Sequence, residues 1–360
     1  MRAPTIRRLG VAREPPPHMA CAQAHGPGGA RAWASGARAA CVRAMTKHAI
    51  VVTTVLPPAV EARLAERFEV RKADARPVER ALIDAAAGAF AVVPSPGDRF
   101  DAEAIARLPG SVRLLASYSV GVDHVDVAAA KARRIAVTNT PDVLTEATAD
   151  LAMHLLLSAA RGTSAAEAML RAGRWRGWAP GQVFGVDLQG KTLGILGLGR
   201  IGRAVAARAA AFGMDLAYHD RAGRGDQGGV RAIGDLDAFW SGCDAISLHA
   251  PSTPETRGVV NAEAVARMRG GVLLVNTARG DLLDDDAVIA GVLSGRIGGL
   301  GLDVFRGEPD FDHRYLDLPR TTLLPHVGSS TAETRLAMGE RVLANLTAAA
   351  SGAPLPNPVG

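Results

Sequence analysis

Short apolar runs alternate with helix-like segments along most of the chain. From His48 onward, runs rich in β-branched residues recur, and between them apolar residues return every three or four positions. This alternation is typical of parallel α/β architecture, in which helices connect neighbouring parallel strands. The first half predicts strands at 49–53, 89–93, 112–116 and 135–139, and helices at 59–67, 102–108 and 127–133.

A long helix separates this first series from a second one. It is predicted over 145–170, with Thr145 as its N-cap. A loop rich in Gly, Trp and Pro follows at 173–181, and we expect its Trp175 and Trp178 to pack the loop rather than bind a ligand.

The second series of strands and helices begins at Lys191. It ends with a helix over 332–350, which stops before a Gly-Ala-Pro-Leu-Pro segment. Its later strands are predicted at 245–249, 272–277, 299–305 and 322–325.

The start of this second series carries a glycine pattern. Residues 191–202 form an apolar strand that runs into Gly-x-Gly-x-x-Gly, and a helix follows. Gly197 permits a tight turn, Gly199 lets the backbone approach a pyrophosphate, and Gly202 lets the helix pack closely on the strand. The helix N-terminus favours phosphates, and Asp220 ends the next strand, where a carboxylate accepts hydrogen bonds from ribose hydroxyls. The segment therefore predicts a dinucleotide site.

Composition and charge narrow the class of protein. The 360 residues are 48% hydrophobic and 21% charged, as in globular enzymes, and no apolar run approaches the roughly 20 residues of a membrane span. The formal charge of +5 is misleading, because residues 1–45 hold seven Arg and one acid, leaving −1 for the remainder. We therefore expect neither nucleic-acid nor membrane binding.

Residues 1–45 differ from the rest of the chain. They are rich in Ala, Arg, Gly and Pro without sustained apolar periodicity, and their scarcity of acids resembles an organellar transit peptide. The favoured interpretation is a disordered or mis-annotated extension before a true start at Met45. Three cysteines in the chain form no disulfide framework, which favours the cytoplasm.

Polar residues follow three of the predicted strands in the second series. Arg279, Glu308 and His326 each come just after an apolar run, where an open α/β sheet faces its ligand crevice. Arg can bind a carboxylate bidentately, His can donate a proton near neutral pH, and Glu can orient that His. Reduction of a 2-keto acid needs this set. His249 is a rival acid, which we place beside the cofactor, and no residue spacing suggests a metal site.

Residues 47–357 resemble the D-isomer-specific 2-hydroxyacid dehydrogenases, particularly the glyoxylate/hydroxypyruvate reductase branch. The resemblance rests on the segments 119–126, 139–150, 190–202, 249–251 and 256–258, together with the three strand ends. It implies that Arg279, Glu308 and His326 are the catalytic residues and that Val120 and Gly121 offer N–H groups to the substrate carboxylate. It also implies cofactor contacts from Thr145, Gly197, Gly199, Arg200, Ile201, Gly202, Asp220, Arg221, His249, Pro251, Thr277, Asp303 and Gly328.

The resemblance also implies an arrangement of domains and a partner. Two doubly wound parallel-sheet domains are expected, with a Rossmann-type cofactor domain (145–327) inserted in a flavodoxin-like substrate domain (46–144 and 328–360). A homodimer is expected. Asp220 favours NAD, because a carboxylate repels a 2′-phosphate, whereas the neighbouring Arg221 and Arg224 leave NADP possible.

Three kinds of function remain open on the sequence. The first is NAD(P)H-dependent reduction of glyoxylate, hydroxypyruvate or a similar small 2-keto acid. The second is an NAD(H)-sensing scaffold, like the corepressors among the relatives. The third is another dehydrogenase of the same scaffold, acting on phosphoglycerate, formate or phosphonate.

Overall fold

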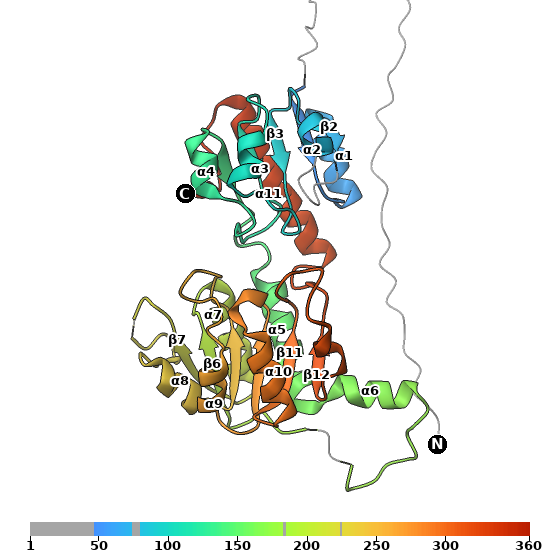
Figure 1. The fold of residues 1–360 in the computed structure, drawn as a ribbon, viewed down its shortest axis with the longest axis vertical. Coiled ribbons are helices and arrows are strands. Elements are labelled where there is room, and N and C mark those ends of the chain that lie inside the picture. Colours follow the sequence, from blue (N-terminus) through green and yellow to red (C-terminus); the bar gives the residue numbers. More distant parts are fainter. Residues whose placement is uncertain (1–46, 74–79, 183–184, 224) are drawn as a thin grey trace, which may run out of the picture. The chain divides into compact units, whose positions relative to one another are not determined.

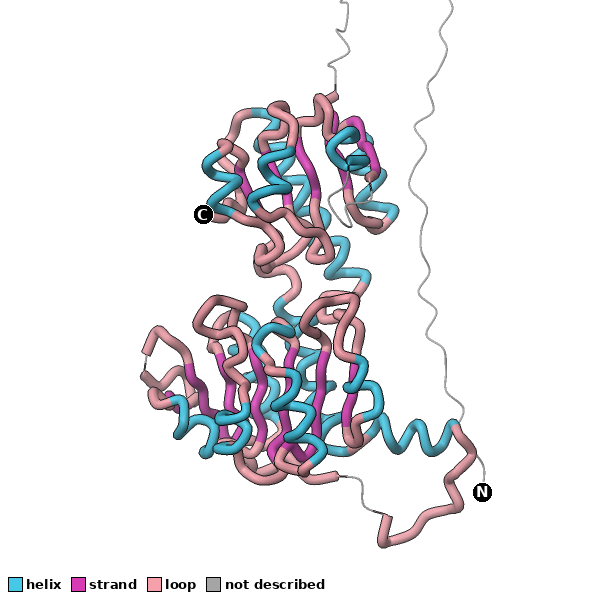
Figure 2. The backbone as a smooth tube through the Cα atoms, in the orientation of Figure 1, coloured by secondary structure: helices cyan, strands magenta, loops and turns pink. Residues whose placement is uncertain are grey.

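The computed structural model describes residues 47–73, 80–182, 185–223 and 225–360. The expectations for residues 1–45, and for Arg224, lie outside these ranges. The described residues form two sheets, each covered by helices on both faces (Figures 1 and 2). Every pair of named strands is parallel, so the predicted α/β class is confirmed.

The first sheet has the flavodoxin-like strand order β2-β1-β3-β4-β5 in the described residues. Apolar side chains of two helices cover one face and those of three helices cover the other. The strands are β1 (Ala49–Val52), β2 (Glu69–Lys72), β3 (Ala91–Val93), β4 (Leu114–Ala116) and β5 (Ala136–Thr138); the helices are α1 (Pro58–Arg67) and α11 (Ala332–Ser351) on one face, and α2 (Arg80–Ala85), α3 (Ala102–Arg107) and α4 (Val127–Ala132) on the other.

The second sheet has the order β12-β11-β10-β9-β6-β7-β8 in the described residues. This is the Rossmann order with one further strand at an edge. Helices α5 and α7 cover one face, and α8, α9 and α10 the other. The strands are β6 (Thr192–Leu196), β7 (Asp215–His219), β8 (Arg231–Ala232), β9 (Ala245–Leu248), β10 (Val272–Asn276), β11 (Ile297–Leu302) and β12 (Thr321–Leu323); the helices are α5 (Thr145–Arg161), α7 (Arg200–Ala211), α8 (Leu236–Gly242), α9 (Ala262–Arg267) and α10 (Asp285–Leu293), with 3-10 turns η1 (Gly280–Leu282) and η2 (His313–Asp317).

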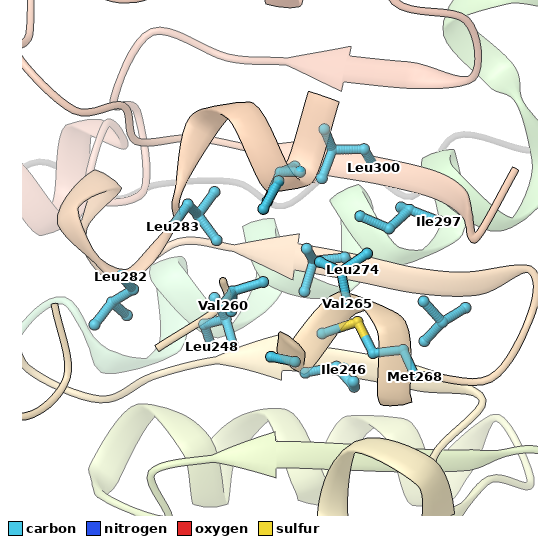
Figure 3. Packing of buried hydrophobic residues seen from close by; sticks show 14 of the residues in the cluster. Ile246, Leu248, Val260, Val265, Met268, Leu274, Leu282, Leu283, Ile297 and Leu300 are labelled. Carbon is cyan, nitrogen blue, oxygen red and sulfur yellow. The ribbon is translucent and has the colours of Figure 1, made fainter. Parts of the chain in front are cut away.

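The core of the second sheet explains why its strands are almost wholly apolar in sequence. All five residues of β10 are buried, because helices cover both faces of the sheet. In Figure 3, Ile246 and Leu274 of two neighbouring strands pack against Val265 and Met268 beside them. This packing fixes the carboxyl ends of the strands, from which the polar residues project.

The long helix predicted over 145–170 is wrong in two respects. Gly162 adopts φ 57° and ends α5, and a separate helix, α6 (Thr163–Arg171), begins directly after it. Glycine takes this left-handed conformation at little cost, so it breaks a helix that apolar periodicity alone would continue. Thr145 is the first helical residue and caps nothing, because the N-cap position is Leu144.

The two tryptophans of the following loop do not pack it as expected. Trp175 is 51% exposed and Trp178 is 83% exposed. Helix α6 has no buried residue and extends away from the second sheet in Figure 1. The helix and loop therefore present apolar side chains to solvent. Among the described helices, none is long and apolar enough to cross a bilayer.

Candidate active site

A cleft of about 770 Å³ lies where the strand ends of both sheets meet, a size typical of small-molecule and cofactor sites. It brings together residues that are more than two hundred positions apart in the chain. The predicted site residues that line it are Val120, Gly121, Ile201, His249, Pro251, Thr277, Arg279, Asp303, Glu308, His326 and Gly328. Those that are not part of its lining are Thr145, Gly197, Gly199, Arg200, Gly202, Asp220 and Arg221.

His326 and Glu308 form a pair in this cleft. Nδ1 of His326 lies 2.7 Å from Oε2 of Glu308, and the other carboxylate oxygen accepts the Phe305 N–H at 2.7 Å. Burial alone would raise the pKa of the Glu308 carboxyl, but the His326 hydrogen bond and charge outweigh it and hold that pKa below its usual range. The carboxylate thus stays ionised and fixes the imidazole, leaving Nε2 for a ligand.

The backbone of His326 is also constrained. It adopts φ 55°, in the left-handed region, and its N–H donates to the carbonyl of Asp303 at 2.8 Å. The Asp303 side chain is 1% exposed and accepts the N–H groups of Val327 at 2.7 Å and Gly328 at 2.8 Å. Burial raises the pKa of this carboxyl in spite of those donors. Asp303 therefore shapes the turn that carries the imidazole.

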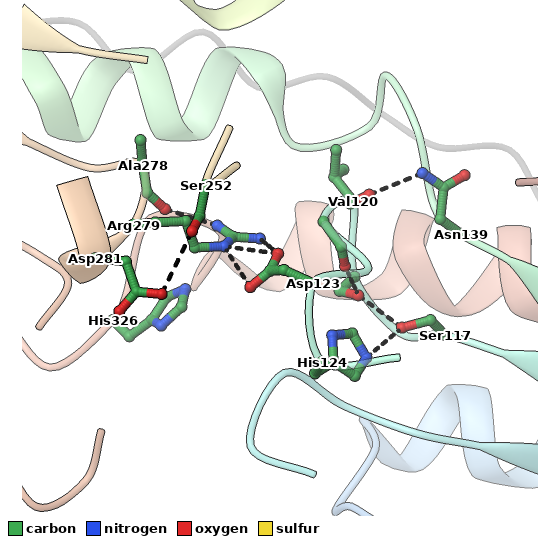
Figure 4. Close-up of polar contacts among 12 residues, drawn as sticks. Ser117, Val120, Asp123, His124, Asn139, Ser252, Ala278, Arg279, Asp281 and His326 are labelled. Carbon is green, nitrogen blue, oxygen red and sulfur yellow. Dashed lines mark hydrogen bonds and ion pairs between the residues drawn. The ribbon is translucent and has the colours of Figure 1, made fainter. Parts of the chain in front are cut away.

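Arg279 is held by a carboxylate of the first sheet. Its Nε lies 2.9 Å from Oδ1 of Asp123, and its Nη2 lies 2.8 Å from the same oxygen (Figure 4). Burial raises the pKa of the Asp123 carboxyl, but the charge and hydrogen bonds of Arg279 lower this pKa by a larger amount, so it lies below its usual range. The Nη1 group donates to the Ala278 carbonyl at 2.6 Å. One N–H on each of Nη1 and Nη2 remains, which suits a bidentate carboxylate.

The sequence reasoning assigned no role to Asp123. A sequence signal for Asp123 existed, because it is a carboxylate two residues after Gly121 in the loop that follows β4. A Cβ at Gly121 would lie 1.7 Å from Nη2 of Arg279, so any larger residue there would displace the guanidinium from this position. Asn139 supports the same loop, donating to the Val120 carbonyl at 2.8 Å (Figure 4).

His249 differs from His326 in its surroundings. Burial lowers the pKa of His249 to about 4, and its Nε2 lies 2.8 Å from the Ser247 hydroxyl. A neutral imidazole is a far weaker acid than the imidazolium ion, so it is a poor proton donor at neutral pH. This favours His326 over His249 as the acid.

The turn between β6 and α7 fits a dinucleotide. Gly197 has φ 96°, as the tight turn requires, and a Cβ at Gly202 would lie 2.4 Å from the Gly197 carbonyl oxygen. Gly199 faces open space, since a Cβ there would meet nothing within 4 Å. In the cleft, the buried Thr277 Oγ1 has no hydrogen-bond partner among the residues that the structure describes. Open space at a helix N-terminus and an unsatisfied hydroxyl are features that a pyrophosphate and a polar ring substituent would complete.

Substituting Gly199 and substituting Gly202 should therefore have different effects on dinucleotide affinity and on stability. Gly199 has φ −77°, which alanine also adopts, and there is room for a methyl group at this position. We therefore expect Gly199→Ala to leave the melting temperature unchanged. The methyl group would keep the backbone away from the pyrophosphate, so dinucleotide affinity should be weaker by about tenfold or more. Gly202→Ala, the matched variant, should lower the melting temperature because its methyl group meets backbone. Calorimetric titration with NADH and thermal melts measure both. Full affinity in Gly199→Ala would contradict the placement of the pyrophosphate.

Two charged residues of the predicted cofactor site have partners within the protein. Arg200 Nη1 lies 2.7 Å from Oδ1 of Asp142, and Arg221 Nη1 lies 3.7 Å from Oε2 of Glu255. Asp220 accepts the Ala222 N–H at 2.9 Å.

The chain is similar to known proteins over most of its length. Residues 153–328 match the family model described as D-isomer specific 2-hydroxyacid dehydrogenase, NAD binding domain. The chain is 41% identical to glycerate dehydrogenase of Hyphomicrobium methylovorum, over 81% of this chain and 92% of that protein. It is 40% identical to glyoxylate reductase of Korarchaeum cryptofilum, over 86% and 95% of the two chains.

A solved structure has a similar fold over nearly its whole length. The NADPH-dependent glyoxylate/hydroxypyruvate reductase of Sinorhizobium meliloti, in complex with NADP and malonate, superimposes with a TM-score of 0.78 at 36% identity. The match covers 87% of this chain and 97% of that one.

Proposed function

This chain belongs to the D-isomer specific 2-hydroxyacid dehydrogenases, and from that premise we propose that it reduces glyoxylate, hydroxypyruvate or a similar small 2-keto acid to the D-2-hydroxy acid with NAD(P)H. The observation that carries this proposal is the cleft itself, in which Arg279, Glu308 and His326 meet beside the cofactor turn. A scaffold that only senses NAD(H) needs no such set.

The residues divide the work between binding and proton transfer. The free N–H groups of Arg279, with the N–H groups of Val120 and Gly121, would bind the substrate carboxylate. Nε2 of His326 would donate a proton to the carbonyl oxygen as negative charge develops there, and Glu308 would stabilise the protonated ring through Nδ1. The imidazole is 38% exposed, so solvent can return the proton. When bound, the reduced dinucleotide supplies the hydride.

The remaining predicted contacts would hold the dinucleotide. Gly197, Gly199, Arg200, Ile201 and Gly202 would lie along the pyrophosphate, where the helix α7 begins. The other contacts proposed are Thr145, Asp220, Arg221, His249, Pro251, Thr277, Asp303 and Gly328.

A panel of keto acids tests the proposed function. The protein is mixed with NADH or NADPH and with glyoxylate, hydroxypyruvate, pyruvate or 3-phosphohydroxypyruvate, and loss of absorbance is followed. We expect turnover of glyoxylate or hydroxypyruvate, and the D-isomer of glycerate as the product of the latter. Absence of turnover with every acid would refute the proposal.

We propose NAD as the preferred cofactor. The Asp220 carboxylate follows β7, where it would accept ribose hydroxyls and repel a 2′-phosphate. We expect a higher kcat/KM with NADH than with NADPH, and we expect Asp220→Ser to reverse that order because the repulsion between the Asp220 carboxylate and the 2′-phosphate is then removed while Arg221 remains to attract the phosphate. A wild-type preference for NADPH would contradict this assignment.

We also propose domain bounds and a compartment. Residues 145–327 would form the cofactor domain, and residues 46–144 with 328–360 the substrate domain; α11 packs with the first sheet, which supports the return of the chain. We propose the cytoplasm as the compartment, because Cys243 is a buried free thiol and thiols stay reduced there.

A homodimer is proposed, with α6 and the loop after it at the interface. Exposed tryptophans on a helix-and-loop segment without buried residues favour a second copy as the partner. Sedimentation or light scattering should give twice the chain mass, and Trp175→Ser with Trp178→Ser should shift it to the monomer. Leu293→Ser, an exposed leucine on α10, serves as the control. A wild-type monomer at micromolar concentration would refute the proposal.

A further inference from the structure

The cleft is lined by a second arginine that the mechanism above does not use. Of the arginines in the described ranges, Arg279 and Arg335 line the cleft. Asp123 holds the first, at 2.8 Å. Arg335 has no carboxylate within ion-pair distance in the described residues, although it is half-buried.

Arg335 lies at the start of helix α11, beside the cleft. Thr331 caps the helix, its side chain accepting the Thr334 N–H at 3.2 Å, and the Arg335 N–H donates to the Thr331 carbonyl at 3.0 Å. Met338, three residues further and so on the same face, also lines the cleft. The loop from His326 leads directly into this helix, so the imidazole and the guanidinium belong to one continuous segment.

Electrostatics make the position unusual for a structural arginine. A cation near a helix N-terminus is opposed by the helix dipole. Burial raises the pKa of Tyr118, and the nearby charge of Arg335 opposes that shift, which places the guanidinium close to a second residue of the cleft lining. A half-buried cation without a counter-charge is costly unless a ligand supplies an acceptor. The position therefore indicates a ligand group.

We propose that Arg335 is a specificity-determining residue that binds a hydrogen-bond-accepting oxygen on C3 of the 2-keto acid. This inference rests on the proposed function, in which Arg279 takes the C1 carboxylate and His326 the C2 oxygen. The C3 substituent is the remaining part of the substrate. Hydroxypyruvate, with a hydroxyl there, and oxaloacetate, with a carboxylate one carbon further, supply an acceptor; pyruvate and glyoxylate do not.

Matched substrates test the inference. Hydroxypyruvate and pyruvate differ by one hydroxyl, so their ratio of kcat/KM isolates the C3 contact. We expect Arg335→Met to lower kcat/KM for hydroxypyruvate by about tenfold or more, and that for pyruvate or glyoxylate by less than about threefold. Arg335→Lys should retain part of the ratio. Arg341→Met, on the same helix but outside the cleft lining, is the control. Oxaloacetate shows whether a charged acceptor is preferred.

Two results would overturn the inference. One is an equal loss for all four acids, which would make Arg335 a support for the cleft. The other is an unchanged hydroxypyruvate-to-pyruvate ratio. Calorimetric binding of tartronate and oxalate to the NADH complex separates this inference from the proposed function. If the wild type reduces no keto acid, yet Arg335→Met weakens tartronate and not oxalate, the proposed reaction fails and the C3 subsite stands. If Arg335→Met weakened the binding of tartronate and oxalate equally, the C3 subsite would be refuted as well.

Discussion

Replacing His326 with asparagine is expected to lower kcat for 2-keto acid reduction by roughly 10²- to 10⁴-fold, the usual contribution of a positioned acid or base. Asparagine suits this test because His326 has φ 55°, a conformation that asparagine tolerates better than most residues. Its amide group is far too weak an acid to transfer a proton. Affinity for NADH should change little, since the dinucleotide turn lies on a different segment.

Steady-state kinetics and calorimetry of the same preparation measure this prediction. His154→Asn is the control, because His154 lies exposed on α5 outside the cleft. Its kcat should match that of the wild type. If His326→Asn kept kcat within threefold, another group would have to donate the proton. His249 would be a poor substitute, because burial lowers its pKa to about 4.

The glycine turn and the strand ends could be predicted because they are local in sequence. The Gly-x-Gly-x-x-Gly spacing can be read directly at Gly197, Gly199 and Gly202. The strand before each candidate residue can also be recognised, because it is an apolar run. Parallel strands place their carboxyl ends at one edge, so Arg279 and His326 could be expected to meet. Both residues line one cleft together with Glu308, which agrees with that expectation.

Other features depend on contacts that periodicity does not contain. The Asp123–Arg279 pair joins residues 156 positions apart, on different sheets. Strands β2 and β8 escaped prediction because both lie at sheet edges, where short segments need not be apolar. Trp178 looked like a packing residue because large apolar side chains are usually buried, yet it is 83% exposed. The residues whose environment the sequence pattern does not predict therefore lie in the cleft or at the surface of the protein.

Arg279→Gln is expected to lower kcat/KM for hydroxypyruvate by roughly 30- to 5,000-fold, corresponding to about 2–5 kcal/mol for loss of one partner of a close charge pair. Two effects add. The substrate carboxylate loses its guanidinium, and Asp123 is left without its cation, 43% exposed at the edge of the cleft. The unpaired Asp123 carboxylate then repels the incoming substrate, so most of the loss should appear in KM.

The second effect can be separated from the first. In the double variant Arg279→Gln with Asp123→Asn, the repelling charge is gone, so kcat/KM should recover several-fold over Arg279→Gln alone. Asp123→Asn by itself should raise KM, because the amide is uncharged and its NH2 group cannot accept the Arg279 Nε–H, which now donates to Oδ2 at 3.0 Å. The four enzymes form a double-mutant cycle whose coupling term measures how Asp123 and Arg279 depend on each other. Strict additivity of the two losses would show that Asp123 neither positions Arg279 nor acts on the substrate through its charge.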